Sequence, residues 1–122
     1  MKAARAIAFA LMLVLPSISA LAQPEPPDDF LQAQTPAWRQ VLKNPIILNF
    51  RDADITSVAA ALGEQGLCQI VVDVPRGQKV PLVTRKFHRT SLRMAIYQVT
   101  QDTGLRADWI YAGKIPQIIR LY

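Results

Sequence analysis

The chain has 122 residues, of which 51% are hydrophobic and 19% are charged, and its formal net charge is +5 at pH 7. This length suits one small folded domain. Lys2 and Arg5 belong to an N-terminal segment that we expect to be removed, which lowers the charge to +3. So small a charge, on a chain that we expect to be exported, argues against a nucleic-acid partner.

Residues 1–22 have the composition of a signal peptide. Basic residues precede an apolar run over residues 6–15, and the segment ends with Ala20-Leu21-Ala22. Small residues in this spacing mark a signal-peptidase site, so we predict cleavage between Ala22 and Gln23 and a periplasmic protein, with association to an outer-membrane complex left open. The apolar run is shorter than the roughly 20 residues of a spanning helix. We therefore expect no membrane insertion after cleavage, with an uncleaved anchor as the alternative.

Residues 23–44 are predicted to be a proline-rich linker followed by a short helix. Gln23 to Asp29 contains three prolines and three acidic residues, a composition typical of an extended linker. Thr35-Pro36 resembles a helix N-cap with proline at the first helical position, and Asn44-Pro45 would end this helix. Two interpretations remain: the helix packs Trp38 on the domain, or Phe30, Leu31 and Trp38 form an exposed docking peptide that only a partner orders.

The first half of the folded domain is predicted to be a strand, a helix and a second strand. An apolar strand over Ile46 to Phe50 leads through a polar corner to Asp54, a good helix N-cap. Gly66 is expected to take the left-handed position that ends the helix, and Cys68 to Val74 reads as a buried strand. Apolar residues at i, i+3, i+4 and i+7 form the helix stripe, namely Ile55, Val58, Ala59 and Leu62.

The second half repeats this pattern and adds one strand. The interval Lys79 to His88 is predicted to be a strand, and Pro81 within it indicates an edge position or a bulge. Thr90 or Ser91 would cap a second helix, Gly104 would end it, and two more strands would follow. The stripe of this helix is Leu92, Ala95, Ile96 and Val99, and the last strands cover Arg106 to Ala112 and Pro116 to Tyr122. Residues 45–122 are thus expected to form a small α+β domain of order βαββαββ, with two helices packed against two small mixed β-sheets.

The residues in this order resemble a known family. Leu48 to Ile55, a helix, Gly66-Leu67 and Ile70 to Asp73 are similar to the opening of the short N-terminal (STN) domain of secretins and TonB-dependent transducers. The second half agrees, with Ser91-Leu92, Ala95-Ile96 and Thr103-Gly104-Leu105. The corner Asp52-Ala53-Asp54-Ile55 is closer to the secretin (N0-like) branch. Secretins and receptors continue into a membrane pore, whereas this sequence stops at Tyr122, so we expect a stand-alone exported domain and not the channel.

The resemblance implies a periplasmic protein–protein interaction domain. Such an adaptor would dock to a secretin-type secretion or pilus channel, or to an envelope transducer. A small secreted ligand-binding protein or enzyme on the same scaffold is the alternative, since a fold does not settle a function. The sequence does not identify the partner, and homo-oligomerisation is left open.

Residues with catalytic or metal-binding chemistry are scarce. His88 has no second histidine or carboxylate pair beside it, and Cys68 is the single cysteine and is expected to be buried and inert. Asp52 and Asp54 are explained by the turn and the cap. We therefore predict no enzyme activity, no metal and no cofactor.

The candidate partner-binding residues are basic. Arg85, Lys86, Arg89 and Arg93 lie close together in the sequence, and the cluster is either a solvated face or a contact for an acidic partner. Arg85 interrupts an alternating apolar face, where its guanidinium would either reach out to water or serve as a contact point.

Overall fold

A computed structural model describes residues 25–75 and 77–122. The predicted cleavage site between Ala22 and Gln23 lies outside these residues. Within these residues, three helices and five strands follow one another as α2 (Pro36–Leu42), β1 (Pro45–Asp54), α3 (Ile55–Gly66), β2 (Ile70–Val72), β3 (Leu82–Ser91), α4 (Leu92–Thr103), β4 (Ala107–Ala112) and β5 (Ile115–Leu121). The predicted α+β class and the βαββαββ order from residue 45 onward are confirmed.

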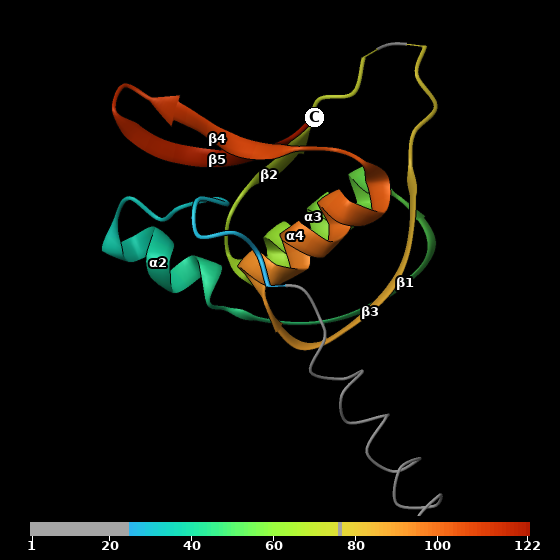
Figure 1. Cartoon of the computed structure of the whole chain (residues 1–122), viewed down its shortest axis with the longest axis horizontal. Coiled ribbons are helices and arrows are strands. Elements are labelled where there is room, and N and C mark those ends of the chain that lie inside the picture. The colour runs from blue at the N-terminus through green and yellow to red at the C-terminus, as the bar shows by residue number, and fades with distance from the viewer. Residues whose placement is uncertain (1–24, 76) are drawn as a thin grey trace, which may run out of the picture.

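The strands form two small sheets. β1 and β3 pair as an antiparallel two-stranded sheet, and β2, β5 and β4 form a second sheet in that order. The second sheet is mixed, because β5 runs parallel to β2 and antiparallel to β4. Figure 1 shows α3 and α4 side by side, with the three-stranded sheet along one side of them and β1 and β3 curving around the other.

The two halves of the domain take equivalent places. The first strands of each half, β1 and β3, pair with each other. The second strands, β2 and β4, lie on opposite sides of β5. The pattern that the second half of the sequence repeats is therefore also seen in the topology of the sheets.

One hydrophobic core joins both helices and both sheets. The two predicted helix stripes are buried, and β1, β3 and β5 add alternating side chains to them. The rings of Phe50 and Phe87 meet edge to face, with centroids 6.1 Å apart. The buried strand residues are Ile46, Phe50, Ile70, Val83, Phe87, Pro116, Ile119 and Leu121. No helix in the described part of the chain is long and apolar enough to cross a membrane.

The polar corner predicted after Phe50 is instead part of β1. The strand continues to Asp54, and its register against β3 shifts between Phe50 and Ala53. Asp52 has a left-handed backbone, with φ 49°, and its N–H donates to Oγ1 of Thr84 at 2.9 Å. A β-bulge thus bends the strand here without ending it. The predicted cap is confirmed, because Oδ1 of Asp54 accepts from the N–H of Ser57 at 2.9 Å.

The end of α3 also differs from the prediction. Gly66 is the last residue of the helix, and Leu67 takes the left-handed conformation with φ 61°. A Cβ on Gly66 would lie 2.5 Å from Cδ2 of the buried Leu92, so a larger residue here would force the Leu92 side chain of α4 to shift. The N–H of Cys68 donates back to the carbonyl of Gly63 at 3.0 Å, as in a Schellman ending. Cys68 therefore lies in a connection, and β2 covers only three residues of the predicted strand.

The second half follows the sequence more closely. The predicted strand Lys79 to His88 is observed three residues later, as β3 from Leu82 to Ser91, so Pro81 precedes the strand and does not interrupt it. Of the two predicted alternatives, the edge position is observed, because β3 belongs to a two-stranded sheet. Of the two candidate caps, Ser91 is the one used, because its hydroxyl accepts from the N–H of Met94 at 3.2 Å. Gly104 takes the left-handed position after α4, with φ 75°, as predicted.

Candidate docking surface

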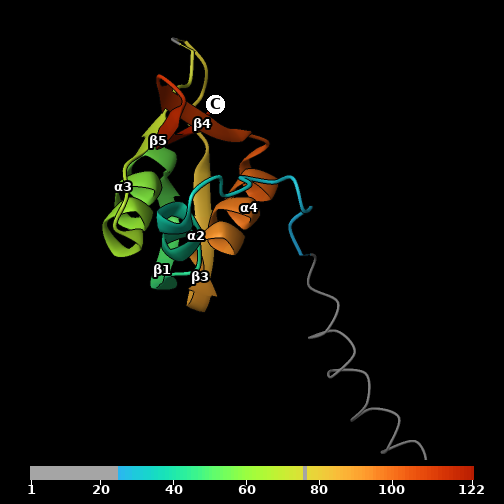
Figure 2. The same cartoon turned by 90° about the vertical axis from the view of Figure 1, so that its left-hand side faces the viewer.

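The segment before the domain packs on it. Residues 25–35, called the arm below, run along α4 and lead into α2, as Figure 2 shows. The ring of Phe30 meets that of Tyr97 on α4, and the ring of Trp38 meets that of Trp109 on β4, with centroid distances of 5.1 and 4.7 Å. Leu31 is only 4% exposed. The interpretation that the helix packs Trp38 on the domain is confirmed, and the exposed docking peptide is not observed.

Hydrogen bonds hold the arm and α2 in place. Nε1 of Trp38 donates to the carbonyl of Pro116 at 2.6 Å, and Nε2 of Gln34 donates to the hydroxyl of Tyr111 at 2.7 Å. Arg93 donates from Nε to the carbonyl of Phe30 at 2.8 Å and from Nη2 to that of Pro27. Sequence reasoning missed this role of Arg93, since nothing in the local pattern shows that a segment more than sixty residues earlier returns to α4.

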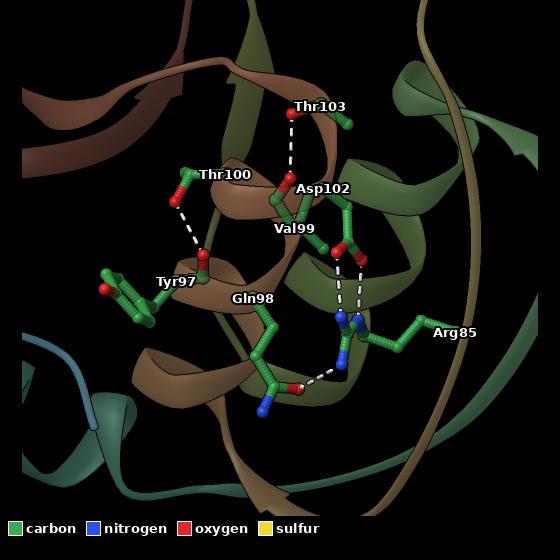
Figure 3. A network of polar contacts seen from close by, with 7 residues as sticks. All are labelled: Arg85, Tyr97, Gln98, Val99, Thr100, Asp102 and Thr103. Atoms are coloured by element: carbon green, nitrogen blue, oxygen red, sulfur yellow. Dashed lines mark hydrogen bonds and ion pairs between the residues drawn. The ribbon is translucent and has the colours of Figure 1, made fainter. Parts of the chain in front are cut away.

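Arg85 is paired within the domain. Its Nε and Nη2 donate to the two carboxylate oxygens of Asp102 at 2.6 and 2.7 Å, and Nη1 donates to Oε1 of Gln98 at 3.3 Å (Figure 3). The hydrogen bonds that Arg85 donates to Asp102 raise the pKa of Arg85 above its usual value. The guanidinium therefore links β3 to the last turns of α4, a role that neither of the two sequence interpretations included.

The last turns of α4 carry two further side-chain hydrogen bonds in the same view (Figure 3). The hydroxyl of Thr100 donates to the carbonyl of Tyr97 at 2.6 Å, and that of Thr103 donates to the carbonyl of Val99 at 2.7 Å. Each hydroxyl thus donates back to a carbonyl of the preceding turn of the same helix.

The four basic candidates do not form one surface. Arg85 and Arg93 have their guanidinium groups engaged as described above. Lys86 and Arg89 are exposed on β3, and neither enters an ion pair within residues 25–75 and 77–122. Their role in partner binding stays a prediction, and on this geometry Lys86 and Arg89 are the members free to meet an acidic surface.

Another arginine forms a pair that the sequence did not reveal. Arg120 on β5 donates from Nε and Nη2 to the carboxylate of Asp108 on β4 at 3.0 and 2.7 Å. Its guanidinium also lies 4.4 Å from the ring centroid of Tyr122. Asp108 and Arg120 face each other in the β4–β5 register. A correct prediction of this hairpin register would therefore have predicted their ion pair.

The residues with reactive side chains belong to different elements, since Cys68 lies between α3 and β2 and His88 lies in β3. Cys68 is half-buried, and burial raises the pKa of its thiol to about 11, which keeps it a poor nucleophile at neutral pH. His88 is exposed on β3. Within the described part of the chain, no three His, Cys, Asp or Glu side chains gather in a way that could hold a metal ion.

Comparison with known proteins gives a structural likeness. No family model and no curated protein matches the chain. The fold is similar to the crystal structure of a protein from Parabacteroides distasonis ATCC 8503 that is provisionally assigned as an anti-sigma factor. The TM-score is 0.52 and the sequence identity 24%, over 70% of this chain and 35% of that one. The likeness extends to the fold, and this chain corresponds to about a third of the other protein.

Proposed function

We propose that this chain is an exported adaptor domain that acts by binding another protein of the cell envelope. The observation that carries the proposal is the topology. The residues that resemble the STN domain form two strand–helix–strand units, whose first strands pair and whose helices share one core. The signal-peptide composition of residues 1–22 supports a periplasmic location.

The partner in this proposal is a secretin-type channel, another secretion or pilus component, or an envelope transducer. The structural likeness described above also supports a protein partner. The similar protein is provisionally assigned as an anti-sigma factor, a name that implies binding to another protein. The proposal includes no catalysis. Acid–base or nucleophilic catalysis needs reactive side chains that converge on one site. Cys68 and His88 lie on different elements, and this favours a function in binding.

Processing is tested first. The mass of the protein recovered from the periplasmic fraction is expected to correspond to a chain that begins at Gln23. A recovered chain that still carries Met1, or recovery from the cytoplasm alone, would contradict export through a cleaved signal peptide.

Partner binding is tested by cross-linking in the envelope of the source organism and mass spectrometry of what is captured. An outer-membrane channel subunit or a transducer is expected. The variant Lys86→Glu/Arg89→Glu is expected to lose this capture while its urea unfolding midpoint stays unchanged, because both side chains are exposed. The matched control is Arg106→Glu/Lys114→Glu, which changes the net charge equally at two other exposed positions.

Two outcomes would contradict these proposals separately. Capture of no envelope protein would overturn the proposed function. Equal loss of capture in the control and in the Lys86/Arg89 variant would show an effect of net charge, and the β3 surface would then not be the docking site.

A further inference from the structure

A cavity of about 380 Å³ opens where the arm, α2 and the start of α4 meet. Among its lining residues are Arg39, Leu42 and Lys43 of α2 and its cap, Ser91 and Arg93 at the start of α4, and Asp28 of the arm. Figure 2 shows α2 in front of β1 and β3, with the arm passing from it towards α4. The volume of the cavity is at the lower end of the range for ligand sites. A space of this size can hold one or two amino-acid side chains.

The charges around this cavity are mostly positive. Arg39, Lys43 and Arg93 line it, against the single carboxylate of Asp28. None of these four residues enters an ion pair within the described part of the chain. The first turn of α4 contains no acidic residue, so nothing there offsets the positive end of the helix dipole. The cavity therefore favours an anionic group.

Apolar side chains also line the cavity. Leu42 belongs to the hydrophobic core and is 4% exposed, and Ala33 packs against that core. Leu42 is already covered by the core, so the apolar surface open to a ligand is mainly that of the half-buried Ala33, which a small inorganic anion would leave uncovered. A group that combines a carboxylate with an apolar side chain would use both parts of the site.

We propose that this cavity receives an acidic segment of the partner protein. An apolar side chain of the segment lies against Ala33, and a neighbouring carboxylate meets Arg39 and Lys43. Arg93 adds charge, but its Nε and Nη2 already hold the arm, so it positions the wall of the site. No aromatic residue lines the cavity, which disfavours stacked nucleic-acid bases. This inference rests on the proposed function and gives its docking surface a second part.

The test is an NMR titration of the exported chain with two capped tripeptides. The probe is acetyl-Leu-Glu-Leu-amide, and its matched neutral control is acetyl-Leu-Gln-Leu-amide. The glutamate peptide is expected to shift the backbone amide signals of Leu42, Lys43 and Ser91 in a saturable way, and the glutamine peptide to bind about tenfold more weakly. The variant Arg39→Gln/Lys43→Gln is expected to lose this difference between the peptides.

A matched variant controls for net charge. Arg51→Gln/Lys114→Gln removes two exposed cations that lie outside both the cavity lining and β3, and it is expected to bind the glutamate peptide as the unchanged protein does. Its spectrum, and that of Arg39→Gln/Lys43→Gln, must keep the dispersion of the folded domain. If Arg39→Gln/Lys43→Gln fails to fold, the single variant Lys43→Gln takes its place, because this side chain is exposed at the end of α2.

Three results would overturn the proposal. The first is equal binding of the two peptides, and the second is inorganic phosphate saturating the same amides while neither peptide does, which would mark a plain anion site. The third is a shift of the same signals with protein concentration alone, which would assign the cavity to a second copy of the chain. Peptide binding here without any captured envelope protein would contradict only the proposed function, and capture without peptide binding would contradict only this site.

Discussion

Gln65 on α3 pairs with both backbone polar groups of Ile47 on β1. Its Nε2 donates to the carbonyl of Ile47 at 2.9 Å, and its Oε1 accepts from the N–H of the same residue at 2.8 Å. The side-chain amide thus takes the place that a neighbouring strand would have at this point of β1. Because unpaired backbone groups at an edge invite pairing with other chains, Gln65 protects β1 as well as fastening α3 to it.

Gln65→Ala is expected to destabilise the domain by about 1 kcal/mol, since two exposed hydrogen bonds are lost and water replaces them in part. The urea unfolding midpoint measures the change. Gln69→Ala is the control, because Gln69 is also exposed and its side chain has no hydrogen bond in the described part of the chain. Equal midpoints for the two variants would show that the amide pairing adds nothing to stability.

Gly66→Ala is expected to destabilise the domain by about 1–3 kcal/mol, because the new methyl group would collide with Leu92 in the packed core. Alanine by itself favours a helix over glycine by about 1 kcal/mol, so the sign of the change decides between packing and propensity. In a double-mutant cycle, Leu92→Ala is expected to relieve part of the loss. A more stable Gly66→Ala variant would contradict the close approach of α3 and α4.

Arg85→Met is expected to cost about 1 kcal/mol, because it removes a bidentate ion pair that is partly open to water. Asp102→Asn in the Arg85→Met background is expected to cost nothing further or to restore stability. The reason is that Asp102 lies in the last turn of α4, where an unpaired negative charge faces the negative end of the helix dipole. Chemical denaturation at low and at 1 M salt measures both effects, and a full second loss would contradict the pairing.

The stability of the domain is expected to fall as the pH rises from about 9 to about 11. Burial holds the pKa of Cys68 near 11, above its usual value of 9.0, so in this range the unfolded chain loses a proton that the folded chain keeps. Deprotonation then favours the unfolded state. The difference between the unchanged protein and Cys68→Ala isolates this effect from tyrosines and lysines. Parallel curves of unfolding free energy against pH for the two proteins would contradict it.

The same burial predicts slow chemistry of the thiol. Iodoacetamide at pH 8 is expected to alkylate Cys68 much faster in urea than in the folded protein, because the thiolate is the reacting form. Rapid alkylation of the native protein, or a disulfide-linked dimer, would contradict a shielded thiol.

Much of the fold was determined by the sequence alone, through interactions between residues close together in the chain. The stripe of Ile55, Val58 and Leu62 fixes the buried face of α3 by helical spacing, and the caps at Asp54 and Ser91 fix where the helices begin. Each needs only neighbours within one or two turns, which is why a local pattern predicts it.

The tertiary structure decided what depends on partners far along the chain. Arg85 meets an aspartate 17 residues away, and Arg93 meets the carbonyl of Phe30 from 63 residues away. Gly66, which the pattern placed at a helix cap, lies against the Leu92 side chain of another helix. The sequence gives the type of a charged or small residue, but it does not show whether that residue faces water, a carboxylate or a neighbouring helix. Its role is therefore set only when the packing of the whole domain brings its partner within contact distance.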